Sequence, residues 1–374
     1  MHEELSNSEL ERYARHISLP QVGLEGQIKL KNSSVLVVGA GGLGSPCLLY
    51  LAAAGFGQIG IIDDDKVDVS NLQRQVIHSN ANLGELKVNS AKRRLLDLNP
   101  EISVKIFNAR LDIENALDLI KQFDIIIDGT DNFQTRYLIN DACEILNKIW
   151  IFASIHQFEG QVSTFNVSPG LNYRDLFPKP PPLEFAPNCA EAGVLGILPG
   201  IIGSIQAAEA IKIILGMGNI LSGKLFLFNA LSMSSRILKF EANISRGLIS
   251  ELSLESEYCM SNSSSGDITP LEYVNKINND DWQPFLLDVR RPDEELISKI
   301  EGTNLTIVHT EIPNRIQEIP SDRDIVIYCR SGVRSAAVQR FLIEAGHTNT
   351  ISVSYTHLRA HETKANLVCR LLLE

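Results

Sequence analysis

Short apolar runs rich in β-branched residues alternate with segments of helical periodicity from residue 33 onward. The strand-like runs are SSVLVVG, QIGIIDD, ISVKIFN, FDIIIDGTD, WIFASIH and QVSTFN. Two clear helical segments between them are SPCLLYLAAAG, which Ser45 can cap with Pro46 in the first turn, and KVNSAKRRLLDLN. Strands that alternate with helices are typical of a doubly wound, mostly parallel sheet. We therefore expect an α/β fold.

The pattern changes at two places along the chain. The segment SPGLNYRDLFPKPPPLEFAPNCAEAG, at about residues 167–192, holds six prolines and no periodicity, which indicates a functional loop. The polar, serine-rich stretch 244–266 is typical of a linker, and a smaller α/β pattern follows it. We predict a first domain over 1–243, a second over 267–353, and a separate tail over 354–374.

Composition and charge narrow the class of protein. The chain has 374 residues, of which 44% are hydrophobic and 21% charged, enough for two globular domains. Its net charge of −11 argues against an extended nucleic-acid surface. Six scattered cysteines favour a reducing, cytoplasmic compartment. The polar first twenty residues contain no signal peptide, and the apolar stretch 193–216 carries Gln206, Glu209 and Lys212, so we expect a buried core helix and no membrane anchor.

The loop VVGAGGLGSP contains glycines at 39, 41 and 44 and matches the dinucleotide fingerprint G-x-G-x-x-G. Asp63 lies at about the distance from it at which a carboxylate binds a ribose. However, Arg74 and Lys87 follow closely, and cations beside a nucleotide favour a polyphosphate over NAD. Asp131 ends another strand-like run, where a carboxylate can hold Mg²⁺ between phosphates.

Five segments in this order carry a resemblance to a known family: ERYARHISLPQVGLEGQ, GAGGLG, SNLQRQ, TDN and NCAEAGVLG. Over roughly residues 8–240 the chain resembles the MoeB/ThiF/HesA-type adenylyltransferases, bacterial relatives of the ubiquitin-activating enzymes. The resemblance implies a Rossmann-like domain that uses ATP and Mg²⁺ to adenylate the C-terminal Gly-Gly carboxylate of a small ubiquitin-fold sulfur carrier. It also implies transfer of sulfur to form a thiocarboxylate, for molybdopterin or thiamine synthesis, with a donor such as a cysteine desulfurase.

The resemblance also implies roles for individual residues. Asp63 would bind the ribose, Asp131 the magnesium ion, and Arg15 the phosphates of a neighbouring subunit's ATP, which implies a homodimer. The expected ATP-binding set is Arg15, Gly39, Gly41, Gly42, Asp63, Ser70, Asn71, Leu72, Gln73, Arg74, Lys87, Asp131 and Asn132. Within it, Arg74, Lys87 and Asp131 are the catalytic candidates. Arg93, Arg94, Asp64 and Asp68 are interpreted as surface residues, and Asp65 stays undecided.

Cys189 lies in the proline-rich loop, at the position of the family's mobile-loop cysteine. It is either a nucleophile that forms a thioester or acyl disulfide with the carrier, or a spectator thiol. The family's usual two C-x-x-C zinc pairs are replaced here by NYRD, with Asn172 and Asp175, and by RGLIS, with Gly247 and Ser250. Because these residues supply no thiolates, we predict no zinc.

The segment YCRSGVRSA follows an apolar run and precedes a helix-like segment, so backbone N–H groups can converge on Cys329. Arg330 and Arg334 add positive charge near Gly332, which favours a thiolate. The loop resembles the rhodanese active loop, and FLLDVRRPDE matches that family's entry strand, which implies a persulfide on Cys329. A C-x₅-R phosphatase loop is the alternative, but Arg334 lies only five positions after Cys329, and the DVR strand favours rhodanese.

The last residues, SYTHLRAHETKANLVCRLLLE, resemble a translated sequencing adapter, so we interpret 354–374 as a non-native tail rather than an amphipathic helix. The rhodanese domain would then be truncated. For the whole chain the leading hypothesis is an adenylyltransferase with a sulfurtransferase module. A non-catalytic carrier-binding scaffold and an NAD-dependent oxidoreductase are the alternatives.

Overall fold

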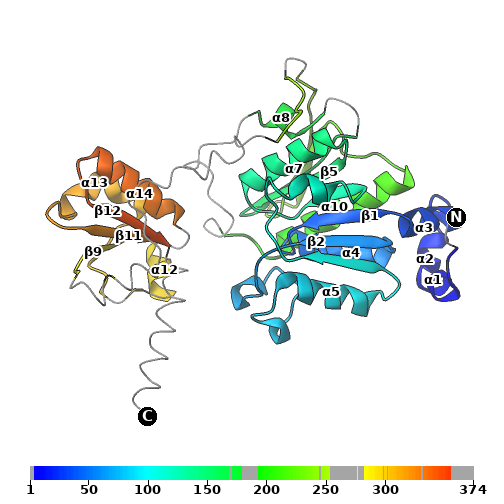
Figure 1. Ribbon diagram of the computed structural model, residues 1–374, viewed down its shortest axis with the longest axis horizontal. Coiled ribbons are helices and arrows are strands. Elements are labelled where there is room, and N and C mark those ends of the chain that lie inside the picture. The colour runs from blue at the N-terminus through cyan, green and yellow to red at the C-terminus, as the bar shows by residue number, and fades with distance from the viewer. Residues whose placement is uncertain are drawn as a thin grey trace, which may run out of the picture. The chain divides into compact units, whose positions relative to one another are not determined.

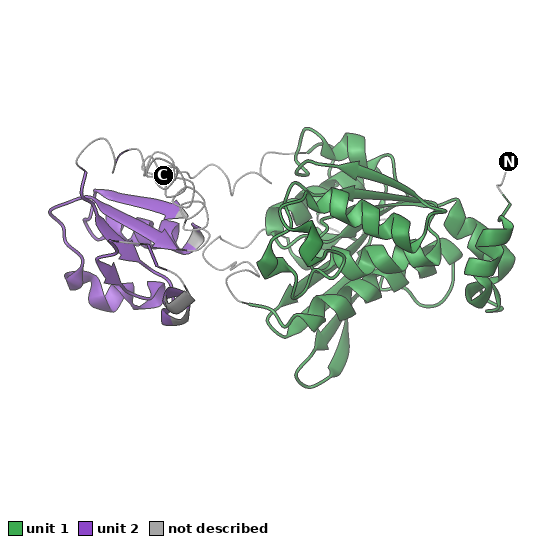
Figure 2. Ribbon diagram, turned by 90° about the horizontal axis from the view of Figure 1, so that it is seen from below, with its two compact units in different colours: residues 1–180, 188–258 green, residues 181–187, 259–374 purple. Residues whose placement is uncertain are grey.

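The computed structural model describes residues 4–167, 171–178, 193–243, 246–252, 276, 282–297, 299–300, 302–329 and 332–354. They form two compact units, the first extending to residue 252 and the second beginning at residue 276 (Figures 1 and 2). Each unit has its own sheet and its own hydrophobic cores.

The first unit is built on an eight-stranded sheet in the order β3-β2-β1-β4-β5-β6-β7-β8. Its strands are β1 (Ser34–Val38), β2 (Gln58–Ile62), β3 (Ser103–Phe107), β4 (Ile125–Asp128), β5 (Ile149–His156), β6 (Glu159–Phe165), β7 (Lys224–Asn229) and β8 (Ser234–Lys239). The strands from β3 to β5 are parallel, and β6 to β8 continue the sheet with antiparallel pairs. The expected α/β fold with a mostly parallel sheet is confirmed.

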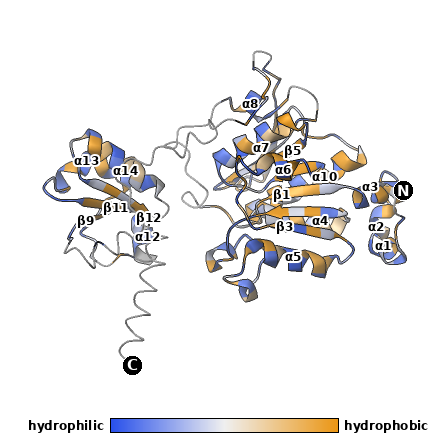
Figure 3. Ribbon diagram, viewed as in Figure 1, coloured by the Kyte–Doolittle hydropathy of each residue, from blue (hydrophilic) through white to orange (hydrophobic). Residues whose placement is uncertain are grey.

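Helices cover both faces of this sheet. They are α1 (Asn7–Arg12), α2 (Ala14–Ile17), α3 (Gly23–Lys31), α4 (Gly44–Ala54), α5 (Lys87–Leu98), α6 (Ala116–Ile120), α7 (Phe133–Ile145), α8 (Tyr173–Leu176) and α10 (Ile197–Leu215), with single 3₁₀ turns η1 (Val69–Asn71) and η2 (Asn80–Asn82). Side chains of α3, α4, α5 and α10 form one core with the sheet, and those of α6, α7 and α8 form the other. Figure 3 shows apolar residues concentrated in the strands and in the helix faces packed on them.

Helix α10 comes from the longest apolar stretch of the sequence. Among the described residues it is the one helix that meets the length and composition of a membrane span. Its Leu198, Ile202 and Ala207 are buried in the core that also contains α4, and Gln206 Nε2 donates to the Asp128 carbonyl at 2.7 Å. The expected buried core helix is therefore confirmed.

The second unit contains a four-stranded parallel sheet in the order β10-β9-β11-β12. Its strands are β9 (Phe285–Asp288), β10 (Leu305–Thr306), β11 (Ile325–Cys329) and β12 (Thr350–Ser354). Its helices are α12 (Pro292–Ile297), α13 (Ile312–Arg315) and α14 (Val333–Glu344), with turns η5 (His309–Glu311) and η6 (Ile316–Glu318). Cys329 is the last residue of the inner strand β11, and α14 begins four residues later, at Val333, after its N-cap residue Gly332.

Candidate functional site

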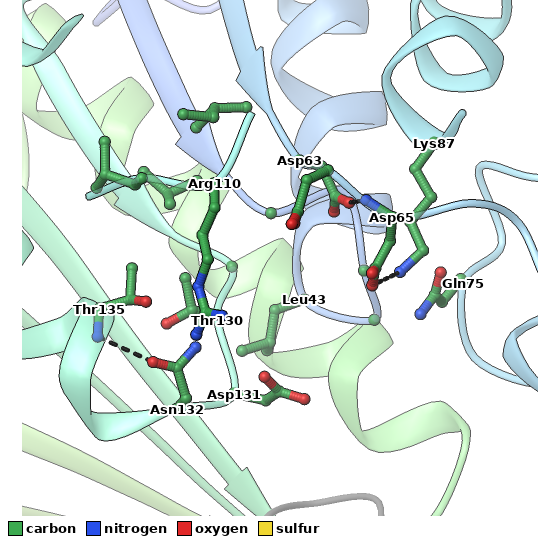
Figure 4. A pocket seen from close by; sticks show the side chains of 18 of the residues that line it. Leu43, Asp63, Asp65, Gln75, Lys87, Arg110, Thr130, Asp131, Asn132 and Thr135 are labelled. Atoms are coloured by element: carbon green, nitrogen blue, oxygen red, sulfur yellow. Dashed lines mark hydrogen bonds and ion pairs between the residues drawn. The ribbon is translucent and has the colours of Figure 1, made fainter. Parts of the chain in front are cut away.

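A cavity of about 310 Å³ opens at the carboxyl ends of the parallel strands in the first unit (Figure 4). The register places the last residues of three strands level with one another, because Val38 of β1 pairs with Ile62 of β2 and with Asp128 of β4. Strand order reverses at this point of the sheet, since the connection from β1 leads to β2 on one side and β4 lies on the other. Open α/β sheets bind their ligands in this crevice.

The glycine-rich loop forms one wall of the cavity. At Gly39, φ is +99°, and an added Cβ would lie 2.8 Å from the Gly129 carbonyl oxygen, so the fold itself requires glycine there. At Gly41 an added Cβ would meet nothing closer than Gln75 Nε2 at 3.7 Å, which is ordinary contact. The protein therefore leaves open space over Gly41, as close approach of a ligand to the backbone requires.

Asp63 lies directly after β2 and is held by the backbone on both carboxylate oxygens. Ala40 N–H donates to Oδ2 at 2.8 Å and Asp65 N–H donates to Oδ1 at 2.9 Å. Burial raises the pKa of Asp63, and the positive charge of Lys87 opposes that rise. The carboxylate thus lines the cavity in a fixed orientation, with acceptor capacity left for hydroxyl groups of a ligand.

Two cations face the same cavity. Lys87 is the first residue of α5 and only 5% exposed, and its Nζ lies 2.8 Å from Oδ2 of Asp65, whose side chain is largely exposed. Arg74 lines the cavity as well, with Nη1 donating to the Ser70 carbonyl at 3.0 Å. A cation that is buried except toward a cavity is available to an anionic ligand, and two of them suit phosphate groups.

The loop after β4 supplies Asp131 and Asn132. Asn132 caps α7, because its Oδ1 accepts from Thr135 N–H at 2.9 Å. Asp131 is exposed and lines the cavity, and no hydrogen bond or ion pair joins its carboxylate to any other described residue. A carboxylate that no described residue pairs with, beside a place for phosphates, has the donor chemistry that Mg²⁺ prefers.

Asp128 and Arg136 support this loop from the protein interior. Thr130 donates to Asp128 Oδ1 through both its N–H and its hydroxyl, and Arg136 Nη2 donates to the Thr130 carbonyl at 3.0 Å. Burial raises the pKa of Asp128, while Arg136, 3.4 Å away, opposes the rise. The pair holds the backbone immediately before Asp131.

The structure brings most, but not all, of the expected nucleotide residues to the cavity. Those that line it are Gly39, Gly41, Gly42, Asp63, Arg74, Lys87, Asp131 and Asn132. Ser70 and Asn71 lie in η1, with Leu72 and Gln73 just after it, and they do not line the cavity. Arg15 is exposed on α2 and also lies outside it.

Sequence reasoning did not single out Arg110, which lines the cavity and extends toward Thr130 and Asn132 (Figure 4). Arg110 follows β3 by three residues, so the rule that strand carboxyl ends share one edge is the signal that points to it. Asp65, left undecided from the sequence, is the ion-pair partner of Lys87.

In the second unit, Cys329 is buried at the end of β11 and lies against the start of α14. Gly332 N–H donates to its sulfur at 3.1 Å and Ser335 N–H at 3.4 Å, with Gly332 at φ +92°. These two donors are the convergent backbone groups expected around the sulfur. Arg334 forms an ion pair with Glu294 on α12. Arg330 lies outside the described residues, as does Cys189.

The two segments that replace the expected zinc pairs meet in space. Arg246 Nε lies 3.2 Å from Asp175 Oδ1 and its Nη1 lies 2.9 Å from Glu144 Oε2, while Asn172 Nδ2 also donates to Glu144. Across the part of the chain that the structure describes, no three Cys, His, Asp or Glu side chains are arranged to hold a metal ion. An ion-pair cluster thus joins these segments to α7, and it contains no thiolate with which to bind zinc.

Comparison with known proteins gives two matches that follow the two units. The ThiF family model matches residues 13–246, and the model of the rhodanese-like domain matches residues 269–356. The chain is 44% identical over 361 residues to the probable adenylyltransferase/sulfurtransferase MoeZ of Mycobacterium tuberculosis, covering 93% of this chain and 91% of that protein.

Two further relatives and one solved structure extend this likeness. A probable molybdopterin-synthase adenylyltransferase of Porphyra purpurea is 45% identical over 345 residues, or 90% of this chain and 89% of that protein. The sulfur carrier protein adenylyltransferase of Thermus thermophilus is 50% identical over 244 residues, which cover 64% of this chain and 90% of that protein. The crystal structure of PaaA is 26% identical, with a TM-score of 0.56 over 64% of this chain and 76% of that one.

Proposed function

The chain belongs to the ThiF family and carries a rhodanese-like domain, and from this premise we propose that it activates a small ubiquitin-fold sulfur carrier. It is an adenylyltransferase with a sulfurtransferase module. The proposed substrate is the C-terminal Gly-Gly carboxylate of the carrier, the co-substrate is ATP, and the end product is a thiocarboxylate. The relatives' names point to molybdopterin synthesis, and a thiamine-type carrier fits the same chemistry.

The observation that supports this proposal most is the meeting of Gly41, Asp63, Arg74, Lys87 and Asp131 at one cavity. Asp63, held by two backbone N–H groups, suits the ribose hydroxyls, and the open backbone at Gly41 suits the nucleotide beside it. Arg74 and Lys87 lie where the phosphates would follow. An NAD-dependent reaction would not need these two cations.

In the proposed first step, a carboxylate oxygen of the carrier attacks the α-phosphorus of ATP. The bond from the α-phosphorus to the oxygen bridging to the β-phosphorus breaks, and pyrophosphate leaves. Negative charge accumulates on groups that are already charged, so Arg74 and Lys87 lower the barrier by neutralising it. Asp131 would hold Mg²⁺, which when bound screens the phosphate charges.

In the proposed second step, the terminal sulfur of a Cys329 persulfide attacks the acyl carbon, the bond from that carbon to AMP breaks, and an acyl disulfide forms between the carrier and Cys329. A thiol reductant then attacks the Cys329 sulfur, so that the S–S bond breaks, the thiocarboxylate leaves, and a second thiol reduces the mixed disulfide left on Cys329. The N–H groups of Gly332 and Ser335 lie where they stabilise negative charge on Cys329. Cys189 is proposed to join the carrier through a thioester or an acyl disulfide. Tethering the sulfur donor to the adenylating domain raises its effective concentration.

We also propose a sulfur source, a compartment and a homodimeric assembly for this protein. A cysteine desulfurase would load the persulfide in the cytoplasm. Arg15, exposed on α2 and outside its own cavity, would reach the ATP of a second subunit in a homodimer. Sedimentation of the purified chain, with an Arg15→Ala variant compared for ATP turnover, tests that arrangement.

The decisive experiment is carrier-dependent exchange of labelled pyrophosphate into ATP. Purified chain is incubated with ATP, Mg²⁺ and each Gly-Gly carrier of the same organism, and a carrier lacking its last two residues serves as the control. Exchange with an intact carrier and none with the shortened one is expected. Binding of a carrier without any exchange would instead support a non-catalytic scaffold with a vestigial nucleotide site.

A further inference from the structure

His78 is a buried histidine next to the cavity that no step of the proposed reaction uses. It follows the SNLQRQ segment, is 7% exposed and does not line the cavity. Its Nε2 lies 3.0 Å from the carbonyl oxygen of Ala40, in the middle of the glycine-rich loop. Its Nδ1 lies 2.8 Å from Oγ of Ser90, on α5.

These partners determine which nitrogen of His78 carries the proton. A carbonyl oxygen only accepts, so Nε2 must be protonated and donate to Ala40, which leaves Nδ1 to accept from the Ser90 hydroxyl. Burial lowers the pKa of His78, so the ring is neutral near pH 7 with this single proton. The ring therefore connects the glycine-rich loop to α5 through two directional hydrogen bonds.

Those two bonds close a ring of contacts that includes three cavity-lining residues, Asp63, Asp65 and Lys87. The rest of this ring of contacts starts at the same residue of the glycine-rich loop. Ala40 N–H donates to Asp63 at 2.8 Å, and Asp63 in turn accepts from Asp65 N–H at 2.9 Å. Asp65 then holds Lys87 twice, because its carbonyl accepts from Lys87 N–H at 2.9 Å and its carboxylate pairs with Nζ at 2.8 Å.

The ring is completed by the first turn of α5, which carries both Lys87 and Ser90. Three nucleotide-facing elements are thereby fixed relative to one another: the loop at Gly41, the carboxylate of Asp63 and the cation of Lys87. Asp65 links Asp63 to Lys87 in this ring of contacts, and His78 links the glycine-rich loop to Ser90.

We propose that His78 is a positioning residue of the ATP site, which holds the glycine-rich loop at the distance from Lys87 that ATP requires. This inference rests on the proposed use of ATP at the cavity. His78 touches no ligand, so it acts through Ala40 and the loop, and its loss should weaken ATP binding before any carrier is engaged.

The test measures ATP affinity by titration calorimetry with Mg²⁺ present and no carrier. His78→Leu removes both hydrogen bonds while filling similar space, and a rise of about tenfold in the Kd for ATP is expected, the size of one net hydrogen bond. His78→Gln keeps an N–H donor near the Nε2 position and should recover most of the affinity. Ser90→Ala removes the hydroxyl that donates to Nδ1 of His78, so the histidine is no longer held in one tautomer. The Kd should rise less, by about threefold.

Melting temperature is measured on the same samples. An unchanged Kd in folded His78→Leu overturns the proposal, and so does a raised Kd that His78→Gln does not restore, since both describe a packing role only. If His78→Leu does not fold, Ser90→Ala decides: a raised Kd at an unchanged melting temperature supports the proposal, and an unchanged Kd overturns it. Absence of ATP binding by the wild-type chain would instead contradict the proposed function itself.

Discussion

Arg334 donates to both carboxylate oxygens of Glu294, with distances of 2.7 Å from Nη1 to Oε2 and 2.9 Å from Nη2 to Oε1. The pair joins α12 to the first turn of α14, the helix that begins beside Cys329. Burial by itself would raise the pKa of Glu294, but the hydrogen bonds and charge of Arg334 outweigh it and bring the pKa to about 2.

Glu294→Gln is therefore expected to destabilise the second unit by about 1–3 kcal/mol at pH 7, because the partly buried Arg334 loses a charged partner. The folded-state pKa of Glu294 is lowered, so its contribution is present above the ordinary carboxyl pKa and is lost as the pH falls toward about 2. Hydrogen exchange of peptides from β11 and α14 at pH 7 and pH 3 measures the difference. The matched control is Glu318→Gln, which removes a solvent-exposed pair with Arg315 and should leave exchange in these peptides unchanged.

Asp131→Ala is expected to reduce carrier-dependent pyrophosphate exchange by at least about 10²-fold, because the proposed magnesium ligand is removed. The control is Asp97→Ala, which removes an exposed carboxylate from α5 that does not line the cavity. Exchange that survives in Asp131→Ala would show that the magnesium assignment is wrong.

Cys329→Ala is expected to leave pyrophosphate exchange at the wild-type rate and to abolish formation of the thiocarboxylate, because the two steps use different units. Mass spectrometry of the carrier measures the second step as replacement of one oxygen by sulfur. A normal yield of thiocarboxylate from Cys329→Ala would place the sulfur donor elsewhere.

As the pH is lowered, ATP binding is expected to weaken at a higher pH than it would if Asp63 had the ordinary pKa of an aspartate. Asp63 must be ionised to accept from two ribose hydroxyls, and burial holds its pKa above the usual value against the opposing charge of Lys87. As the pH falls toward that raised pKa, the Kd for ATP should rise. Asp63→Asn should raise the Kd about 10- to 100-fold at pH 7 and flatten the acid limb, and calorimetric titrations from pH 5 to pH 8 measure both effects.

The same variant is expected to change the stability of the fold little. Because the pKa of Asp63 is higher in the folded than in the unfolded chain, its ionised form costs folding free energy at neutral pH. Asp63→Asn removes that cost, but it also replaces one accepting oxygen by an NH2 group, so that either Ala40 N–H or Asp65 N–H loses its acceptor. Because these two effects oppose each other, a net change within about 1 kcal/mol is expected, and a large loss of stability in denaturant would contradict this account.

Arg246→Met is expected to destabilise the first unit by about 3 kcal/mol, because the cation is lost while Glu144 and Asp175 stay buried. If zinc is absent as predicted, a chelator should leave the melting temperature of the wild-type chain unchanged, because the ion pairs of Arg246 join these segments. Atomic-emission analysis that found about one zinc per chain would refute the prediction that zinc is absent.

Much of the fold followed from local pattern. The β-branched runs from SSVLVVG onward became β1 to β6, because alternating strands and helices leave few topologies for a parallel sheet. The glycine-rich loop and Asp131 were likewise placed at one edge, since both follow parallel strands. Arg110 was missed although it obeys the same rule, because it belongs to none of the segments that carry the family resemblance.

The sequence by itself determined the fold class, the glycine-rich loop and the chemical types of residue at the cavity, all of which depend on short-range periodicity and spacing. Only the tertiary structure decided which charges meet. Arg246 and Glu144 are 102 residues apart, and His78 reaches Ala40 across 38 residues. The energy of such contacts depends on distance and burial, which the packing of helices on the sheet sets and no local pattern of the chain contains.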